Sequence, residues 1–334
     1  MIGTAAVTAG AIVKPVAGRA GTDALLEAAR KEGEVNWYTS LVVNTAVRPM
    51  AAAFRKKYPG IEVNTVTGKV GDLLVRVNEE LQAGKLAADV YHGATTLQNL
   101  RKQNEVARFL PKSAGGYPAE LVDPDGYWIA QEVNFEGPAC NTDMVSEAEM
   151  PKAYEDLLDP KWKGQIAWAA AMQQGGPPGF IATVLADMGD DEGLAYLKRL
   201  AAQKIVNVPT NQRALLDSVA SGEYPLALCI YSHHVGIIQR DKAPVRFISL
   251  KPRVSSTLDP LYLMAKAPHP NAGKLFIDFI SSPEGQKVLL GGGYNPALPE
   301  YRDRDKSYPA YSVTPNAVSA HLEKWISIYD QLFT

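Results

Sequence analysis

Short apolar segments typical of β-strands alternate with amphipathic helical segments through the first ninety residues. Strand-like segments span 34–40, 61–68 and 87–94, and helical patterns fill 44–60 and 70–85. Strands that alternate with helices predict a parallel sheet covered by helices. In such an α/β fold, ligands bind beyond the carboxyl ends of the strands, where loops turn into helices. The three strand-to-helix loops are therefore the first places to expect a binding site.

A second strand–helix series covers residues 164–240, and two long extended segments, 127–145 and 244–270, flank it. We interpret these segments as crossings between two lobes, with hinges around 131–137 and 252–258. The predicted first lobe comprises residues 21–132 and 257–295, and the second comprises 133–256 and 296–334.

The composition excludes several classes of protein. The chain has 334 residues, 46% hydrophobic residues and a formal net charge of −2. A balance this close to neutral argues against nucleic acid as a partner, because binding the phosphate backbone requires a basic surface. Two cysteines, Cys140 and Cys229, are too few for a disulfide framework and could form one bridge or remain two buried thiols.

The N-terminal segment resembles a secretion signal. Residues 1–20 are small and apolar, contain no acidic residue and end in "VAGRA", a small-residue pattern typical of a signal-peptidase site. We expect the mature protein to begin near residue 20 or 21 and to be periplasmic. The alternative is an ordinary N-terminal tail.

Several segments together resemble a known family: "GEVNWYTS", "FRKKYPGIEVNTVTG", "RVNEELQAGKLAADV", "YEDLLDPKWKGQIAW", "SGEYPLAL" and "APHPNAGKLFIDFISSPEGQKVL". The chain is similar to periplasmic solute-binding proteins of ABC importers, in the branch that includes ferric-ion-binding proteins. The resemblance implies a two-lobed periplasmic-binding-protein fold (type II), with two hinge-crossing strands and a ligand cleft between the lobes. It also implies a monomer without enzymatic activity or cofactor, which delivers its ligand to a membrane permease.

The resemblance also allows a test for iron. Ferric binders of this branch hold the ion with a tyrosine pair after "GE" and with a histidine and a glutamate from the first lobe. In this chain Ser232 and His233 align with the tyrosines, Val42 with the histidine and Ala94 with the glutamate. Because all four positions differ, we expect no bound metal. Ferric or other metal-ion transport, or ligand sensing for a receptor, remain the alternatives.

The predicted binding residues are mostly hydrogen-bond donors, which suit a small organic anion or a polar solute. Six belong to the strand-to-helix loops of the first lobe: Thr39, Ser40, Thr67, Gly68, Ala94 and Thr95. For the hydroxyl residues, helix capping is the alternative role. Nine more follow later in the chain: Asn134, Gln173, Gln174, Gly175, Arg213, Tyr231, Ser232, His233 and Tyr262.

Two further interpretations complete the prediction. Adjacent side chains diverge on a strand or a helix, so His233 and His234 are not expected to grip one ion, and His234 is expected to contribute little. No nucleophile, zinc or nucleotide motif of a known enzyme class occurs in the sequence. We therefore expect a binding protein.

Overall fold

The computed structural model describes residues 19–334 except 171–174 and 303–306. The chain forms two compact units. Unit 1 contains the described residues up to His92, together with 100–130 and 261–288, and unit 2 contains 93–99, 131–260 and 289–334. Four segments that the sequence analysis assigned to the first lobe fall in unit 2: 93–99, 131–132, 257–260 and 289–295. The predicted leader lies almost entirely outside the described residues.

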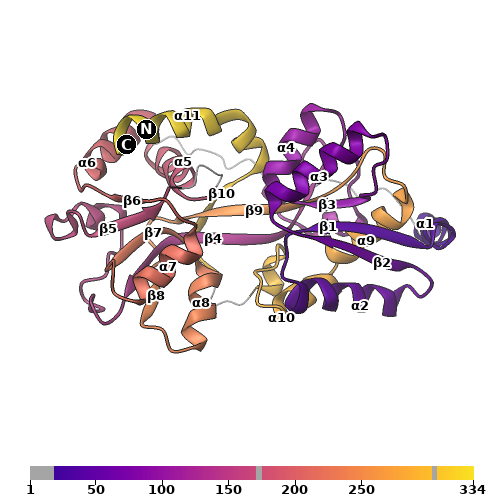
Figure 1. Ribbon diagram of the computed structural model, residues 1–334, viewed down its shortest axis with the longest axis horizontal. Helices are drawn as coiled ribbons and strands as arrows, with labels where there is room; N and C mark the ends of the chain where they lie inside the picture. Colours follow the sequence, from indigo (N-terminus) through magenta and orange to yellow (C-terminus); the bar gives the residue numbers. More distant parts are fainter. Residues whose placement is uncertain (1–18, 171–174, 303–306) are drawn as a thin grey trace, which may run out of the picture. The chain divides into compact units, whose positions relative to one another are not determined.

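Unit 1 is built on a short parallel sheet. Strand β1 (Glu34–Thr39) pairs in parallel with β2 (Glu62–Thr67) and β3 (Val90–His92), and β3 pairs antiparallel with the end of β9 (Val254–Leu263). Helix α3 (Val70–Gln82) covers one face and α2 (Arg48–Lys57) the other (Figure 1).

Other elements of unit 1 pack around this sheet. Helix α1 (Arg19–Glu32) lies against α9 (Pro270–Ile280), which contacts β1. A π-helical turn (Val43–Val47) precedes α2, and α4 (Ala94–Lys102) and α10 (Pro283–Gly291) contain residues of both units. The Trp37 and Phe54 rings each meet the Phe276 ring edge-on, with centroids 5.2 and 5.0 Å away, so aromatic packing joins the sheet to its helices.

One buried carboxylate, Asp89, ties α9 to β1. Its Oδ2 accepts the backbone N–H of Asn36 at 2.7 Å and lies 3.0 Å from Nδ1 of His269. Its Oδ1 accepts the backbone N–H of His269 at 2.6 Å. Both carboxylate oxygens are therefore used. Burial raises the pKa of Asp89, and these hydrogen bonds oppose the rise.

Unit 2 contains a mixed sheet. Strand β5 (Ile166–Ala169) pairs in parallel with β6 (Val206–Val208) and β7 (Leu226–Tyr231), while β4 (Ile129–Asn141) pairs antiparallel with β7 and β8 (Val245–Phe247). Strand β9 lies next to β4 and pairs in parallel with β10 (Ala310–Val313).

Helices cover both faces of the unit 2 sheet (Figure 1). Helices α5 (Pro177–Met188), α6 (Asp190–Ala201) and α11 (Pro315–Phe333) lie on one face. Helices α7 (Gln212–Ala220) and α8 (Ser232–Arg240) lie on the other. The remaining helical turns are 3₁₀ segments at Lys112–Gly116, Ala119–Leu121, Tyr154–Leu158, Pro160–Trp162 and Pro299–Tyr301. The predicted α/β architecture is confirmed.

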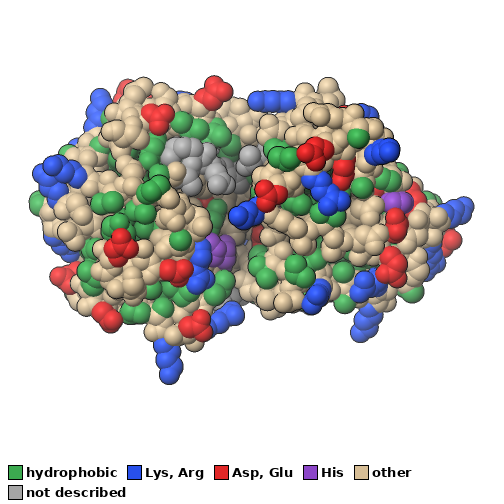
Figure 2. Space-filling model, viewed as in Figure 1, with side chains coloured by type: hydrophobic (Ala, Val, Ile, Leu, Met, Phe, Trp, Pro, Cys, Tyr) green, Lys and Arg blue, Asp and Glu red, His purple; other side chains and the backbone are tan. Residues whose placement is uncertain are grey.

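Three observations settle or limit the remaining expectations. Cys140 and Cys229 are buried free thiols, so the second alternative for the cysteines holds. No helix among the described residues is long and apolar enough to cross a bilayer. On the face drawn in Figure 2, acidic and basic side chains are interspersed, as the small net charge predicts.

Candidate functional site

A row of alternating polar side chains lies along the buried strand β4. Glu132, Asn134 and Glu136 alternate with Val133 and Phe135, so the three polar residues share one face of the strand. All three are buried, with exposed fractions of 3%, 8% and 2%. Only Asn134 is among the binding residues predicted from the sequence. The missed signal is the alternation itself, because a buried strand rarely contains two carboxyl groups without a function.

The hydrogen bonds that Glu136 accepts with good geometry from the described residues all reach one of its two carboxyl oxygens. Its Oε2 accepts the backbone N–H of Gly176 at 2.7 Å and the side-chain amide of Gln212 at 3.3 Å. Its Oε1 is buried and has no hydrogen-bond partner among the described residues. Burial raises the pKa of Glu136 to about 8, against smaller opposing contributions from its neighbours, so this carboxyl holds its proton at neutral pH.

Glu132 and Asp259 form a second pair of acids. Carboxyl oxygens of the two residues lie within 4.8 Å of one another. The side chain of Asn134 donates to Oδ2 of Asp259 at 2.8 Å, while Oε2 of Glu132 is buried without a partner in the described part of the chain. Burial, followed by the charge of Asp259, raises the pKa of Glu132 well above its ordinary value. Two like charges this close favour one shared proton.

Tyr231 and the two histidines lie where β7 meets α8. The rings of Tyr231 and His233 are stacked with centroids 5.3 Å apart, and the His233 and His234 centroids are 4.4 Å apart. The adjacent imidazoles are thus in contact, closer than the sequence analysis expected. Burial raises the pKa of the Tyr231 hydroxyl well above its ordinary value, and the charge of Glu136 adds to the rise.

Both histidines are neutral at physiological pH. Burial first, then the neighbouring His234, lowers the pKa of His233 to about 3. Burial first, then the charge of Arg213, lowers the pKa of His234 to about 4. The Nδ1 atoms of both rings and the hydroxyl of Ser232 are buried without hydrogen-bond partners among the described residues. These rings can bind as neutral ligands or donors, but they bring no positive charge.

Glu132, Glu136, Tyr231 and Asp259 are called the acid–phenol cluster below, and all four belong to unit 2. They are linked electrostatically, because Glu136 and Asp259 both raise the pKa of Tyr231. The two glutamates are buried, whereas Tyr231 and Asp259 are partly exposed. The cluster therefore combines buried acidic groups with two members that are partly exposed.

The loop residues predicted in unit 1 do not form a comparable set. The hydroxyl of Thr39 is buried, lies 3.0 Å from Nδ1 of His92 and accepts the backbone N–H of Leu41. Ser40 and Thr67 are exposed. The backbone N–H of Gly68 donates to the carbonyl of Thr39 at 3.4 Å. Thr39 thus fills a local structural role.

Several other predictions have different outcomes. Tyr262, one of the predicted binding residues, is 1% exposed and stacks on Tyr91 with centroids 5.6 Å apart, which places it in the core of unit 1. Arg213 pairs with Asp217 on α7 at 3.2 Å and is engaged there rather than unpaired. Ala94 is buried at the start of α4. Gln173, Gln174 and the side chain of Thr95 lie outside the described residues.

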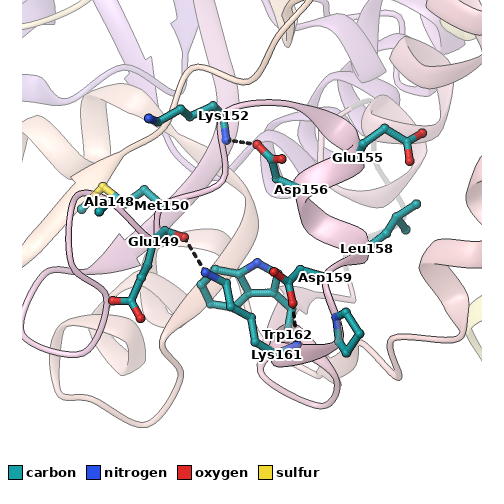
Figure 3. Close-up of a pocket in the computed structure, with 11 residues that line it drawn as sticks. Ala148, Glu149, Met150, Lys152, Glu155, Asp156, Leu158, Asp159, Lys161 and Trp162 are labelled. Atoms are coloured by element: carbon teal, nitrogen blue, oxygen red, sulfur yellow. Dashed lines mark hydrogen bonds between the residues drawn. The ribbon is translucent and has the colours of Figure 1, made fainter.

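A separate open groove of about 680 Å³ lies in the segment before β5 (Figure 3). Its polar groups already bind one another. Asp156 accepts the backbone N–H of Lys152 at 2.7 Å, and the Lys161 ammonium donates to the carbonyl of Glu149 at 3.0 Å. No member of the acid–phenol cluster lines it. Although this groove is large, its polar groups are already paired with one another. It is therefore less suited to bind a ligand than the acid–phenol cluster is.

Comparison with known proteins decides the family. Residues 49–315 match the model of the bacterial extracellular solute-binding proteins. The chain belongs to this family. It is a periplasmic solute-binding protein of the ABC importer type, in the ferric-binding-protein-like branch, as the sequence analysis predicted. Proteins of this kind act in transport by delivering a ligand to a permease.

Relatives of this solute-binding protein include proteins named for iron. It is 26% identical over 279 residues to Iron uptake protein A1 of Synechocystis, covering 79% of this chain and 75% of that protein. Iron-bound HitA from Pseudomonas aeruginosa superposes with a TM-score of 0.72 at 22% identity, over 90% of this chain and 99% of HitA. The Trichodesmium protein IdiA, or FutA, solved with iron and citrate, gives 0.76 at 21% identity, over 90% and 100%. These two structures support the two-lobed fold.

Proposed function

We propose that this solute-binding protein captures a hard metal cation, with ferric iron as the first candidate, for delivery to an ABC permease. The observation that carries the proposal is the acid–phenol cluster: three carboxyl groups and one phenol, with buried carboxyl oxygens on Glu132 and Glu136 that have no hydrogen-bond partner among the described residues. Carboxylate and phenolate oxygens are the ligands that a small, highly charged cation prefers.

The same cluster disfavours the small organic anion that the sequence analysis expected. An incoming carboxylate would meet the Glu132–Asp259 pair of acids and two neutral imidazoles, none of which offers a positive charge. Arg213, the cation expected to bind it, is paired with Asp217. A metal cation would instead replace the proton that Glu136 holds at neutral pH and would relieve the repulsion between Glu132 and Asp259.

The expectation of no bound iron depended on four aligned positions, two of which correspond to the tyrosine pair. Ser232 and His233 occupy those positions, but Tyr231 directly precedes them and its phenol is the one that meets Glu136. The alignment also places no acid at Ala94, whereas β4 supplies two glutamates. The names of the relatives, one for iron uptake and one solved with iron, support ferric ion as the first candidate among hard cations.

A titration of iron-free protein tests this proposal. Ferric ion, supplied as its citrate chelate, is expected to bind one-to-one and to give a visible phenolate-to-iron absorption band. Tyr231→Phe should remove the band. The matched control is Tyr262→Phe, which removes a phenol from the core of unit 1 and should keep the band. Zinc, ferrous ion and a panel of organic acids are titrated in parallel. Tight binding of an organic acid without any ferric binding would overturn the proposal.

A further inference from the structure

Gly175 and Gly176 approach the acid–phenol cluster with their backbone. The N–H of Gly176 donates to Oε2 of Glu136 at 2.7 Å, and Gly176 is the residue that precedes helix α5. Its φ of 81° and ψ of −153° lie in a region that only glycine occupies readily. The conformation of Gly176 therefore explains why glycine stands there, but it does not explain Gly175.

Gly175 is required for a different reason, which is space. A Cβ atom added to Gly175 would lie 2.5 Å from Oε1 of Glu136 and 2.7 Å from the hydroxyl of Tyr231. Carbon and oxygen atoms that are not bonded do not approach this closely, so one or both oxygens would have to move. The unpaired oxygen of Glu136 and the phenol oxygen thus face the same small space beside the Gly175 Cα.

We infer that Gly175 is a positioning residue of the binding site: its bare Cα lets the Glu136 carboxyl and the Tyr231 phenol converge so that both can reach one ligand. The effect on affinity rests on the proposed function, whereas the effect on the geometry does not. Any side chain at position 175 would separate the two oxygens, and a ligand held by both would lose one of them. Such a displacement lowers affinity, because the protein atoms that bind a ligand must be held within about 0.5 Å of their working positions.

The first arm of the test measures binding. Gly175→Ala is expected to weaken ferric binding at least about tenfold and to shift or weaken the phenolate-to-iron band. The matched control is Gly236→Ala in helix α8, also in unit 2, where an added Cβ meets no heavy atom within 4 Å. That variant should bind as the wild type does. Wild-type affinity and an unchanged band in Gly175→Ala would overturn the inference.

The second arm needs no ligand. In glycine-labelled protein, the amide proton of Gly176 should resonate far downfield, since short hydrogen bonds to carboxyl oxygens deshield the proton. Glu136→Gln identifies that resonance. Gly175→Ala is expected to move it and Gly236→Ala to leave it in place. A resonance that does not move in Gly175→Ala would also count against the inference.

The two arms separate the inference from the proposed function. If wild-type protein does not bind ferric ion but the Gly176 resonance moves in Gly175→Ala, the function fails and the positioning role stands. A third variant covers poor folding of Gly175→Ala. Adding Glu136→Asp shortens the crowded side chain by one methylene and should restore folding of the double variant. If the double variant folds no better, the crowding lies elsewhere and the inference is wrong.

Discussion

Each unit contains a buried carboxyl group on or beside a central strand, and the two are used differently. Asp89 in unit 1 accepts two backbone N–H groups and contacts a histidine nitrogen, which occupies both of its oxygens. Glu136 in unit 2 accepts hydrogen bonds of good geometry through Oε2, and its Oε1 has none from the described residues. Burial raises the pKa of both groups. The two carboxyl groups differ because Oε1 of Glu136 has no hydrogen-bond partner among the described residues, whereas both oxygens of Asp89 have one.

This difference separates a structural acid from a binding acid. A carboxylate whose oxygens are all paired compensates for its burial and stabilises the fold. A buried oxygen without a partner raises the free energy of the empty protein, and a cation can recover that free energy on binding. Asp89 thus fixes α9 to the sheet, whereas Glu136 and Glu132 keep capacity for a ligand. The following predictions test this contrast, from the largest expected effect to the smallest.

Removing Asp89 should cause the largest loss of stability. Asp89→Ala leaves the N–H groups of Asn36 and His269 without their acceptor. We expect the free energy of unfolding to fall by about 3–5 kcal/mol, as for other broken buried networks. Urea unfolding followed by circular dichroism measures it, with Asp89→Asn as the milder control that keeps one carbonyl oxygen. A loss below about 1 kcal/mol would show that Asp89 is not structural.

Replacing Glu136 should change how stability depends on pH. The pKa of Glu136 is about 8 in the folded protein against an ordinary value near 4.5, so the folded state holds the proton more tightly. This contribution to stability is complete below about pH 4.5 and is lost as pH rises through about 8. Glu136→Gln removes the titration and should flatten the decline, by up to about 5 kcal/mol between these limits.

Thermal or urea unfolding at a series of pH values checks this prediction. The groups that face Glu136 are Tyr231 and Cys229 on β7, and neither thiol nor phenol is expected to ionise in this range, because burial raises both pKa values. Glu136→Gln should also lower ferric affinity while leaving the protein folded. Parallel curves for variant and wild type would mean that Glu136 does not carry its proton in the folded state.

Much of the fold could be predicted because its signals are local. The strand–helix alternation of unit 1 and the two long extended segments depend on patterns within a few dozen residues. The site depends on pairing between distant segments. Glu136 is buried because β4 pairs with β7 and because the Gly175–Gly176 loop covers it. Tyr262 is a core residue because β9 pairs with β3 in the register that places Tyr91 opposite it. Neither pairing can be seen in the sequence around the residue concerned.

Arg213 should give the smallest effect, although the sequence analysis expected it to bind the ligand. Its guanidinium pairs with Asp217 one turn along α7, and both side chains are largely exposed, with fractions of 41% and 56%. Exposed pairs with this spacing contribute about 0.3–0.5 kcal/mol. Its charge also lowers the pKa of His234, but burial is the larger cause, so His234 stays neutral without it. We therefore expect Arg213→Ala to change ferric affinity by less than about threefold, measured by the same titration. A tenfold loss would place Arg213 at the ligand, and the organic anion would again become the preferred solute.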